Sequence, residues 1–295
     1  MSAVAQTWGG SRAPRYGRGM SLAPPDSLPS TVAPEEYPWL GPSATSALLL
    51  ADGVVDLEPG ADGGADDAGS HQDSAVPAQP AEDQVTPLVD RAAIEQVLAA
   101  AGAAPLAERT LVLAVGSNQT PWTIARKYRR SGRDIDVTTP FVRCTVHGLA
   151  VGHVPSSAAP GYLPAAPYRA DGERMELVAT WFDEEQLAVV DRTEPNYDRL
   201  RLEAADVPLA LATGERPAHV DVYASRWGVL ARDGVPIPLR HRQQELFDEL
   251  HALTGDERLI GAAAEICARL AADPEVVRGL AREHGLVAGD GLPRP

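Results

Sequence analysis

The sequence predicts an α+β fold in which a mixed sheet of about five or six strands is combined with short helices and a helical C-terminal extension. The continuous apolar run at 110–115 is typical of a buried strand. Further strand-like stretches stand at 143–151, 176–182, 198–203 and 219–224. From about residue 240 onward, apolar side chains recur at helical spacing instead, which predicts helices.

Composition and residue patterns divide the chain into an N-terminal lead-in, a domain and an extension. The 295 residues suffice for one large domain or two small ones, at roughly 100–200 residues per domain. Residues 1–87 are acidic and rich in Pro, Gly and Ala, residues 88–250 carry the strand and helix patterns of a domain, and residues 251–295 form the helical extension. The core is therefore expected within 88–250.

The lead-in at 1–87 is predicted to be largely disordered. No Lys or Arg stands between Arg18 and Arg91, and the segment 60–69 contains only Gly, Ala and Asp, so it has nothing to bury against a core. One island differs and consists of Tyr37-Pro-Trp-Leu40 and then residues 46–55. Within it, Asp52-Gly53 lies between two apolar runs and is a hairpin signal. A weak hairpin near 46–57 is expected to dock on the main domain, and the alternative is an element that binds a protein partner.

Helix boundaries can be predicted from capping residues. A helix at 91–101 is expected to begin after Asp90, whose side chain can cap it, and to end before Gly102. A second helix is expected after Thr120, which would cap it, with Pro121 at the first position, where the missing N–H costs nothing.

The turn Gly116-Ser117-Asn118 follows the buried strand and precedes the second helix. Glycine lets the backbone turn sharply and lets a ligand approach closely. The first N–H groups of the following helix lack partners and carry partial positive charge, which suits a carboxylate or an oxyanion. The turn is thus either an anion-binding floor or an ordinary strand-to-helix connection. Ser117 lacks the Gly-x-Ser-x-Gly context of a serine nucleophile.

Glu194 stands at the end of a short predicted helix that Asp183 caps, with Gln186 three positions on as in a capping box. Pro195 forbids continuation of the helix, so the Glu194 carboxylate can point inward over a cavity. A carboxylate held in a partly apolar pocket can act as a general acid or base near neutral pH. Glu194 is therefore a candidate acid/base, and the alternative is a solvated loop acid.

These two features, in this order, resemble the γ-glutamylcyclotransferase-like family. The hallmarks of that family are an apolar strand ending in Tyr-Gly-Ser-Asn and a later Leu-Asp-x-x-Glu-Gly segment that leads into a strand with tyrosine. Here the motifs read Val115-Gly-Ser-Asn118 and Val190-Asp-Arg-Thr-Glu-Pro195, followed by Tyr197. Val115 replaces the tyrosine of the family and Pro195 replaces its glycine. The resemblance covers about 111–250, under half of the chain.

The resemblance implies a mixed sheet or small barrel of the γ-glutamylcyclotransferase-like type, and release of 5-oxoproline from a γ-glutamyl amide or amine. The α-amine of this small-molecule substrate would attack its own γ-carbonyl, and no cofactor or metal is needed. The alternative is a non-catalytic domain of the same fold that binds a small molecule or a protein partner. The resemblance implies Glu194 as the catalytic acid/base and a substrate-binding set of Val115, Gly116, Ser117, Asn118, Tyr197 and Tyr223.

Charge and cysteine content exclude several classes of partner. The net charge of −15 makes nucleic acid and anionic membranes poor partners. No apolar run approaches the roughly 18–20 residues that a bilayer span needs, and the N-terminus lacks the pattern of a secretory signal. Cys144 and Cys267 have no zinc-binding spacing and are typical of reduced thiols. A cytoplasmic location is expected.

The remaining candidate residues point to no chemistry of their own. The basic patch at 126–130 contains Lys127, the only lysine of the chain, and is expected to be a solvated helix end. Its alternative role is to receive the acidic lead-in or an anionic group. No metal-ligand spacing is found among the scattered histidines His147, His153, His219, His241 and His251. Of these, His147 and His153 lie around a predicted strand and are expected to be core or surface imidazoles.

Overall fold

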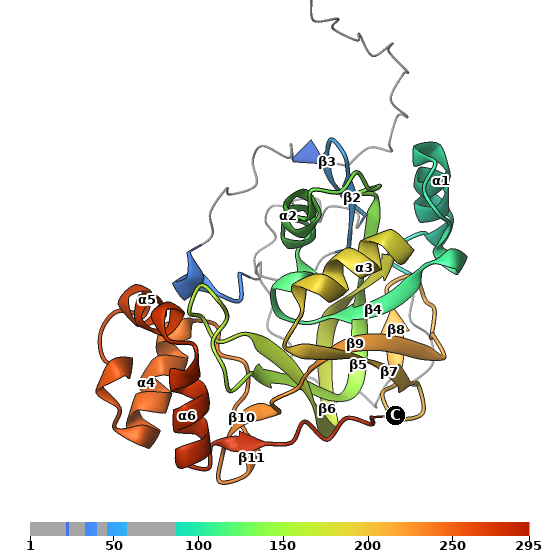
Figure 1. Ribbon diagram of the computed structural model, residues 1–295. Coiled ribbons are helices and arrows are strands. Elements are labelled where there is room, and N and C mark those ends of the chain that lie inside the picture. Colours follow the sequence, from blue (N-terminus) through green and yellow to red (C-terminus); the bar gives the residue numbers. More distant parts are fainter. Residues whose placement is uncertain (1–21, 24–32, 40–45, 58–86, 295) are drawn as a thin grey trace, which may run out of the picture.

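The large sheet of the protein is mixed, and the predicted α+β class is confirmed. The computed structural model describes residues 22–23, 33–39, 46–57 and 87–294 (Figure 1). Within them the strand order is β1-β3-β2-β5-β6-β4-β9-β7, with β8 beside β5. The bounds are β1 (Leu22–Ala23), β2 (Ala47–Leu50), β3 (Gly53–Asp56), β4 (Thr110–Ala114), β5 (Thr139–His153), β6 (Ala165–Phe182), β7 (Tyr197–Glu203), β8 (Leu209–Leu211) and β9 (His219–Ser225).

The centre of this sheet is the long hairpin of β5 and β6, which have 15 and 18 residues. β4 lies between β6, to which it is antiparallel, and β9, to which it is parallel. The Asp52-Gly53 turn joins β2 and β3 in an antiparallel hairpin, and β2 pairs with β5, so this hairpin is part of the large sheet. No pairing between the described strands joins β1 to β7.

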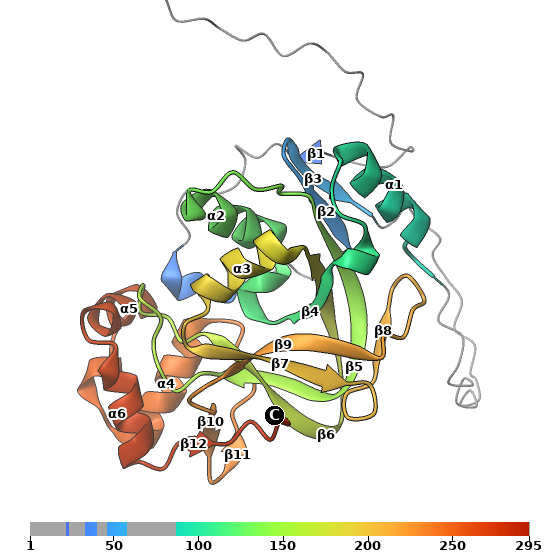
Figure 2. The same ribbon diagram turned by 45° about the vertical axis from the view of Figure 1, so that its right-hand side comes forward.

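Helices cover both faces of the sheet. Side chains alternate along β4, so Val112 and Leu113 enter different hydrophobic cores. The core on the side of Val112 is closed by α2 (Pro121–Ser131) and α3 (Glu184–Thr193), which lie side by side over the sheet in Figures 1 and 2. The other core is closed by α1 (Arg91–Ala101) through Ile94 and Leu98.

The C-terminal part builds a second core of its own. The helices α4 (Gln243–Thr254), α5 (Ala263–Ala272) and α6 (Glu275–Glu283) pack around Phe247 and Ile266 and form a group beside the large sheet (Figure 1). The expected boundary between residues 250 and 251 falls inside α4. A small sheet connects the two parts through β10 (Val229–Arg232), β11 (Val235–Pro236) and β12 (Val287–Ala288).

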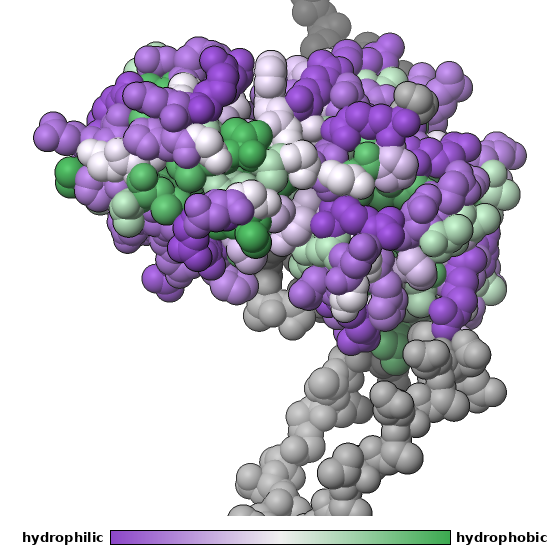
Figure 3. Space-filling view, turned by 90° about the horizontal axis from the view of Figure 1, so that it is seen from below, coloured by the Kyte–Doolittle hydropathy of each residue, from purple (hydrophilic) through white to green (hydrophobic). Residues whose placement is uncertain are grey.

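Short 3-10 turns complete the described fold: η2 (Pro34–Glu36), η3 (Leu106–Glu108), η4 (Gly116–Gln119) and η5 (Glu257–Leu259). Seen from below, the surface in Figure 3 mixes hydrophilic and hydrophobic side chains in small groups. None of the described helices combines the length and the apolar character that a membrane crossing requires.

Several element predictions can be compared directly with the structure. α1 begins after Asp90, whose side chain accepts from the Ala92 N–H at 2.8 Å, and ends at Gly102 in the left-handed conformation, as predicted. The capping box of Asp183 and Gln186 at the start of α3 is confirmed. The strands β5 and β6 extend well beyond the predicted 143–151 and 176–182. Most of the predicted disordered lead-in lies outside the described residues.

Candidate functional site

A pocket of about 210 Å³ opens where β4 and α3 both end. Its walls also include the face of α2 and, from the N-terminal part of the chain, Tyr37 beside η2. The pocket brings together most of the site residues predicted from the sequence. The predicted residues that line it are Val115, Ser117, Asn118, Glu194, Tyr197 and Tyr223, and Gly116 is buried in the turn next to them.

The turn after β4 contains a glycine that has no room for a side chain unless a neighbour shifts. Gly116 has a φ of 59°, a left-handed conformation that favours glycine. A Cβ atom at this position would lie 2.3 Å from the Tyr37 hydroxyl oxygen and 2.9 Å from the Ala165 Cβ. The close approach of backbone and a neighbouring group was expected here, but the group that approaches is a side chain of the protein itself.

The helix after the turn begins at Pro121, as predicted, but its cap differs from the prediction. The turn 116–119 is a 3-10 helix of its own, and Thr120 does not cap α2 with its side chain. The Thr120 hydroxyl instead donates to the Ser117 carbonyl at 2.8 Å and lies 2.8 Å from the Thr123 hydroxyl. The expectation of a Thr120 cap is therefore wrong, because the hydroxyl bonds back to the 3-10 turn that precedes it.

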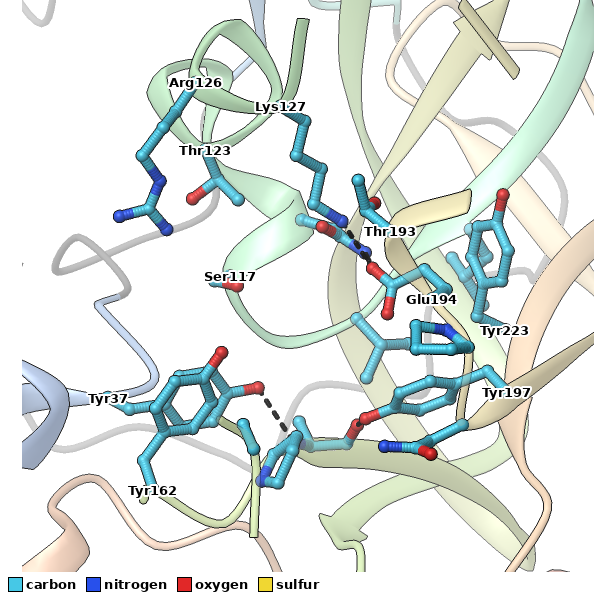
Figure 4. Close-up of a pocket in the computed structure, with 18 residues that line it drawn as sticks. Tyr37, Ser117, Thr123, Arg126, Lys127, Tyr162, Thr193, Glu194, Tyr197 and Tyr223 are labelled. Carbon is cyan, nitrogen blue, oxygen red and sulfur yellow. Dashed lines mark hydrogen bonds and ion pairs between the residues drawn. The ribbon is translucent and has the colours of Figure 1, made fainter. Parts of the chain in front are cut away.

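Glu194 is delivered to the pocket by the end of α3, as predicted. It is the C-cap residue of that helix, and Pro195 follows it. Its Oε1 accepts a hydrogen bond from Asn118 Nδ2 at 2.9 Å and forms an ion pair with the Lys127 ammonium (Figure 4). The Glu194 and Lys127 side chains are 14% and 15% exposed, so the pair is largely withdrawn from solvent. The polar partners of the carboxylate are thus an amide and an ammonium group, while residues such as Val115 and Pro195 supply apolar parts of the pocket wall.

The tyrosines on the Glu194 side of the pocket are fixed through their hydroxyls. Tyr197 donates to the Ala165 carbonyl at 2.9 Å, and Tyr223 donates to Asp191 Oδ1 at 2.7 Å. Burial raises the pKa of both phenols, so they stay protonated at neutral pH. Their rings form the wall, and both hydroxyl protons are already donated to groups of the protein.

Tyr37 is a pocket residue that the sequence did not predict. Its ring stacks on that of Tyr162 with centroids 4.3 Å apart, and its hydroxyl oxygen accepts from the Ala165 N–H at 2.8 Å (Figure 4). Burial raises the pKa of Tyr37, and the hydrogen bond from the Ala165 N–H acts in the opposite direction. The hydroxyl thus stays protonated and occupies part of the predicted anion-binding turn.

The basic residues of α2 divide between the pocket and the solvent. Arg129 and Arg130 are exposed, as expected for a solvated helix end. Lys127 and Arg126 line the pocket instead, so the expectation of a solvated patch is wrong for these two residues. Thr123 also lines the pocket, and Arg126 and Lys127 follow it by three and four positions. Residues at this spacing lie on one face of a helix. That spacing, with a single lysine in the chain, is the signal by which sequence reasoning could have found them.

The other candidate residues lie away from the pocket. His153 is buried, and its Nε2 accepts from the Arg240 N–H at 2.8 Å. Cys144 and Cys267 are free and buried. Among the described residues, no group of three or more His, Cys, Asp or Glu side chains could hold a metal ion.

Comparisons with known proteins leave the family of the chain open. No family model matches the sequence, and no curated protein matches it. Among solved structures, it is similar to an Arabidopsis thaliana protein (At3g28950.1) with 18% identity and a TM-score of 0.29, over 40% of this chain and 62% of that one. A gamma-glutamyl cyclotransferase is similar with 16% identity and a TM-score of 0.31, over 40% and 67%. The uncharacterized protein loc79017 of Homo sapiens is similar with 13% identity and a TM-score of 0.32, over 64% and 93%.

Proposed function

We propose that the protein is a γ-glutamylcyclotransferase-like enzyme that releases 5-oxoproline from a γ-glutamyl amide or amine. The observation that carries the proposal is that the Glu194 carboxylate and the turn at 116–118 face one small pocket, with Asn118 Nδ2 bonded to Glu194 at 2.9 Å. The pocket of about 210 Å³ is smaller than the roughly 300–1,000 Å³ typical of sites for drug-sized ligands, which suits a small substrate.

In the proposed reaction, the neutral α-amine of the substrate attacks its own γ-carbonyl carbon. A bond forms between the amine nitrogen and that carbon, and the bond from the carbon to the leaving amine breaks. Glu194 takes the proton that the attacking amine loses and returns it to the leaving amine. Binding both groups of one molecule in a small pocket supplies the proximity advantage of an intramolecular reaction.

The developing negative oxygen needs hydrogen-bond donors. A hydroxyl oxygen that accepts a bond from an N–H group still has its own proton to donate, and Tyr37 lines the pocket. We therefore assign the Tyr37 O–H as a donor to this oxygen, beside the N–H groups of the turn. Tyr37 would thus supply a phenol next to Val115, where the related family has its tyrosine.

Lys127 would hold Glu194 in place between proton transfers. Asn118 and Lys127 both contact Oε1, which leaves Oε2 as the oxygen for proton transfer. The proposed cyclisation moves protons and an acyl group only, so it calls for no redox cofactor. We infer a cytoplasmic enzyme from the two isolated, reduced cysteines. The N-terminal segment stays a proposed contact for a protein partner.

A non-catalytic domain that binds a small molecule is the second candidate function. The observation in its favour is the Glu194–Lys127 ion pair, which engages the proposed acid/base. The enzyme would release 5-oxoproline and the binding domain would not, but both would use the same pocket.

The test is release of 5-oxoproline from a panel of γ-glutamyl amino acids and amines. Glu194→Gln is expected to lower turnover by about 10²–10⁴-fold, the usual contribution of a general acid/base. Glu185→Gln is the matched control, since Glu185 is an exposed residue of the same helix. Turnover that survives Glu194→Gln would sink the mechanism, and lack of turnover on every substrate would favour the binding domain.

A further inference from the structure

Arg126 is a cation of the pocket that the proposed reaction does not use. The other pocket cation, Lys127, is neutralised by Glu194. Arg126 therefore gives the pocket lining a net positive charge, in a protein of net charge −15. In the part of the chain that the structure describes, no carboxylate pairs with Arg126. Its pKa is lowered by burial and then by the nearby Arg130 and Arg129. A partly buried guanidinium among other cations favours an anion from outside.

Aromatic rings hold this guanidinium in place. The Arg126 Cζ lies 5.6 Å from the ring centroid of Trp39 and 5.3 Å from that of Trp122, and the two rings are 5.9 Å apart. Cation–π contacts stabilise the guanidinium without using its N–H groups as hydrogen-bond donors to oxygen. A planar donor group of this kind matches a carboxylate or a phosphate.

Trp39 is itself fixed by the segment that carries it. Its indole Nε1 donates to the Ala33 carbonyl at 2.8 Å, and its ring packs edge-on against Tyr37 and Tyr162 at 5.0 and 5.1 Å. Its φ of 55° is rare for a bulky residue, and such conformations gather at ligand-binding sites. The segment at 33–39 thus brings both the hydroxyl of Tyr37 and the aromatic support of Arg126 to the same pocket.

We propose that Arg126, framed by Trp39 and Trp122, is a subsite that binds a carboxylate or phosphate on the part of the ligand distant from Glu194. Arg126 and Lys127 are consecutive residues of α2, so their side chains leave the helix in directions about 100° apart. Figure 4 shows the result, with Lys127 turned to Glu194 and Arg126 on the side of Ser117 away from that carboxylate. The charged group recognised by Arg126 therefore sits away from the α-amine that Glu194 would serve.

The subsite is tested with two probes that differ in one carboxylate, γ-glutamylglycine and γ-glutamylglycinamide. Only the choice of probe rests on the proposed function. Calorimetric titration of the full chain should show γ-glutamylglycine binding at least about tenfold more tightly, as expected for one charge-assisted hydrogen-bonded contact. Inorganic phosphate should compete with it. If inorganic phosphate binds through Arg126 and does so more tightly than γ-glutamylglycine, the subsite stands and its natural anion is a phosphate.

Variants on α2 decide whether Arg126 is responsible. Arg126→Gln should abolish the preference for the carboxylate, and Arg126→Lys should restore part of it. Arg129→Gln removes the same charge from an exposed position of the same helix and should keep the preference intact. Equal affinity for the two probes, or a preference that persists in Arg126→Gln, would overturn the subsite. Failure of both probes and of inorganic phosphate to bind would overturn it as well.

Quantifying 5-oxoproline in the titrated samples separates this inference from the proposed function. A carboxylate preference that depends on Arg126 without any 5-oxoproline supports the subsite and counts against the enzyme. Turnover of both probes without a preference has the opposite meaning, since the reaction would stand and the subsite would fall.

Discussion

One polar cluster lies where β4 and α3 both begin, and a second lies where both end. The two clusters have different roles. At the start of both elements, Arg109 donates from Nη1 to the Thr138 carbonyl and to Gln186 Oε1, each at 3.0 Å, and from Nε to the Ala104 carbonyl at 2.7 Å. At the other end, Glu194 pairs with Lys127 beside the Gly116 turn. The Arg109 side chain is fully buried, while Glu194 borders a cavity of about 210 Å³.

The difference shows that buried charge does not by itself indicate function. Arg109 carries as much charge as any pocket residue, and Asp136 and Asp183 lie 3.9 Å from its Nη2. Yet its Nη1 and Nε donors are bonded to groups of the protein, and they anchor the start of α3. Glu194 and Arg126 stand beside open space instead, where a ligand can complete their interactions. Substitutions should therefore affect mainly stability at one end of these elements and mainly ligand chemistry at the other.

The largest effect on stability is expected at Arg109. Arg109→Met removes one side of a buried charge cluster and should lower the free energy of unfolding by about 3 kcal/mol, measured by urea denaturation. Turnover per folded molecule should stay unchanged. Arg174→Met is the control, because Arg174 is 62% exposed and its ion pair with Glu176 should contribute less than about 1 kcal/mol. A large loss of turnover in folded Arg109→Met would contradict the division between the two ends.

The next effect is expected at the turn of the pocket. Gly116→Ala and Gly132→Ala both force alanine into a left-handed conformation, with φ values of 59° and 66°, at a cost of about 1 kcal/mol or more each. Only Gly116 has a neighbour in the way, since a Cβ would lie 2.3 Å from the Tyr37 hydroxyl and none lies within 4 Å of Gly132. Gly116→Ala should therefore lower the free energy of unfolding by about 2 kcal/mol, and Gly132→Ala by about 1 kcal/mol.

The same clash can be tested by a double substitution. Tyr37→Phe removes the hydroxyl oxygen that the new Cβ would meet, so the Gly116→Ala/Tyr37→Phe protein should lose less stability than the sum of the single changes. Additive losses would mean that Tyr37 does not limit the turn.

A smaller loss of stability is expected for Tyr37→Phe alone, combined with an effect on chemistry. The substitution leaves the Ala165 N–H without its acceptor and should cost about 1 kcal/mol of folding free energy. If the hydroxyl stabilises the developing oxyanion, kcat should fall about tenfold with little change in KM. Tyr168→Phe, outside the pocket, should change neither quantity. A normal kcat in Tyr37→Phe would restrict Tyr37 to a structural role.

The smallest effect is a pH dependence from His153, another buried polar group that only supports structure. Burial lowers the pKa of His153 to about 4, below the ordinary value near 6.5, so the unfolded chain binds this proton more readily than the folded protein does. Stability should therefore fall as the pH drops below about 6.5, by about 1 kcal/mol between pH 7 and pH 5.5. Comparing the urea midpoints of His153→Gln and His147→Gln tests this, because only the former should flatten the dependence.

Local signals account for what the sequence could predict. The α1 boundaries, the capping box of α3 and the turn after β4 depend on residues that are neighbours in the chain. The same holds for the way Glu194 enters the pocket, because Pro195 ends α3 there. The family resemblance then paired Glu194 with the Gly116 turn, and the structure brings both to one pocket.

Long-range contacts account for what the sequence could not predict. Tyr37 reaches the Ala165 N–H across 128 positions of sequence, and no periodicity or motif encodes that meeting. The role of Lys127 could be predicted only in part. Helical spacing places it on one face of α2, but only the packing of α2 against α3 brings that face to the pocket. For this reason the ammonium partner of Glu194 could not be predicted from the sequence.

The position of the only lysine has a practical consequence. Every other basic side chain apart from histidine is an arginine, so amine-selective acylation can modify this protein at a single side chain, in addition to the α-amine of the chain. That side chain is Lys127, inside the pocket and paired with Glu194. The rate of its acylation, followed by mass spectrometry, therefore reports occupancy of the pocket without any engineered label, and any compound that slows the reaction can be identified as a ligand.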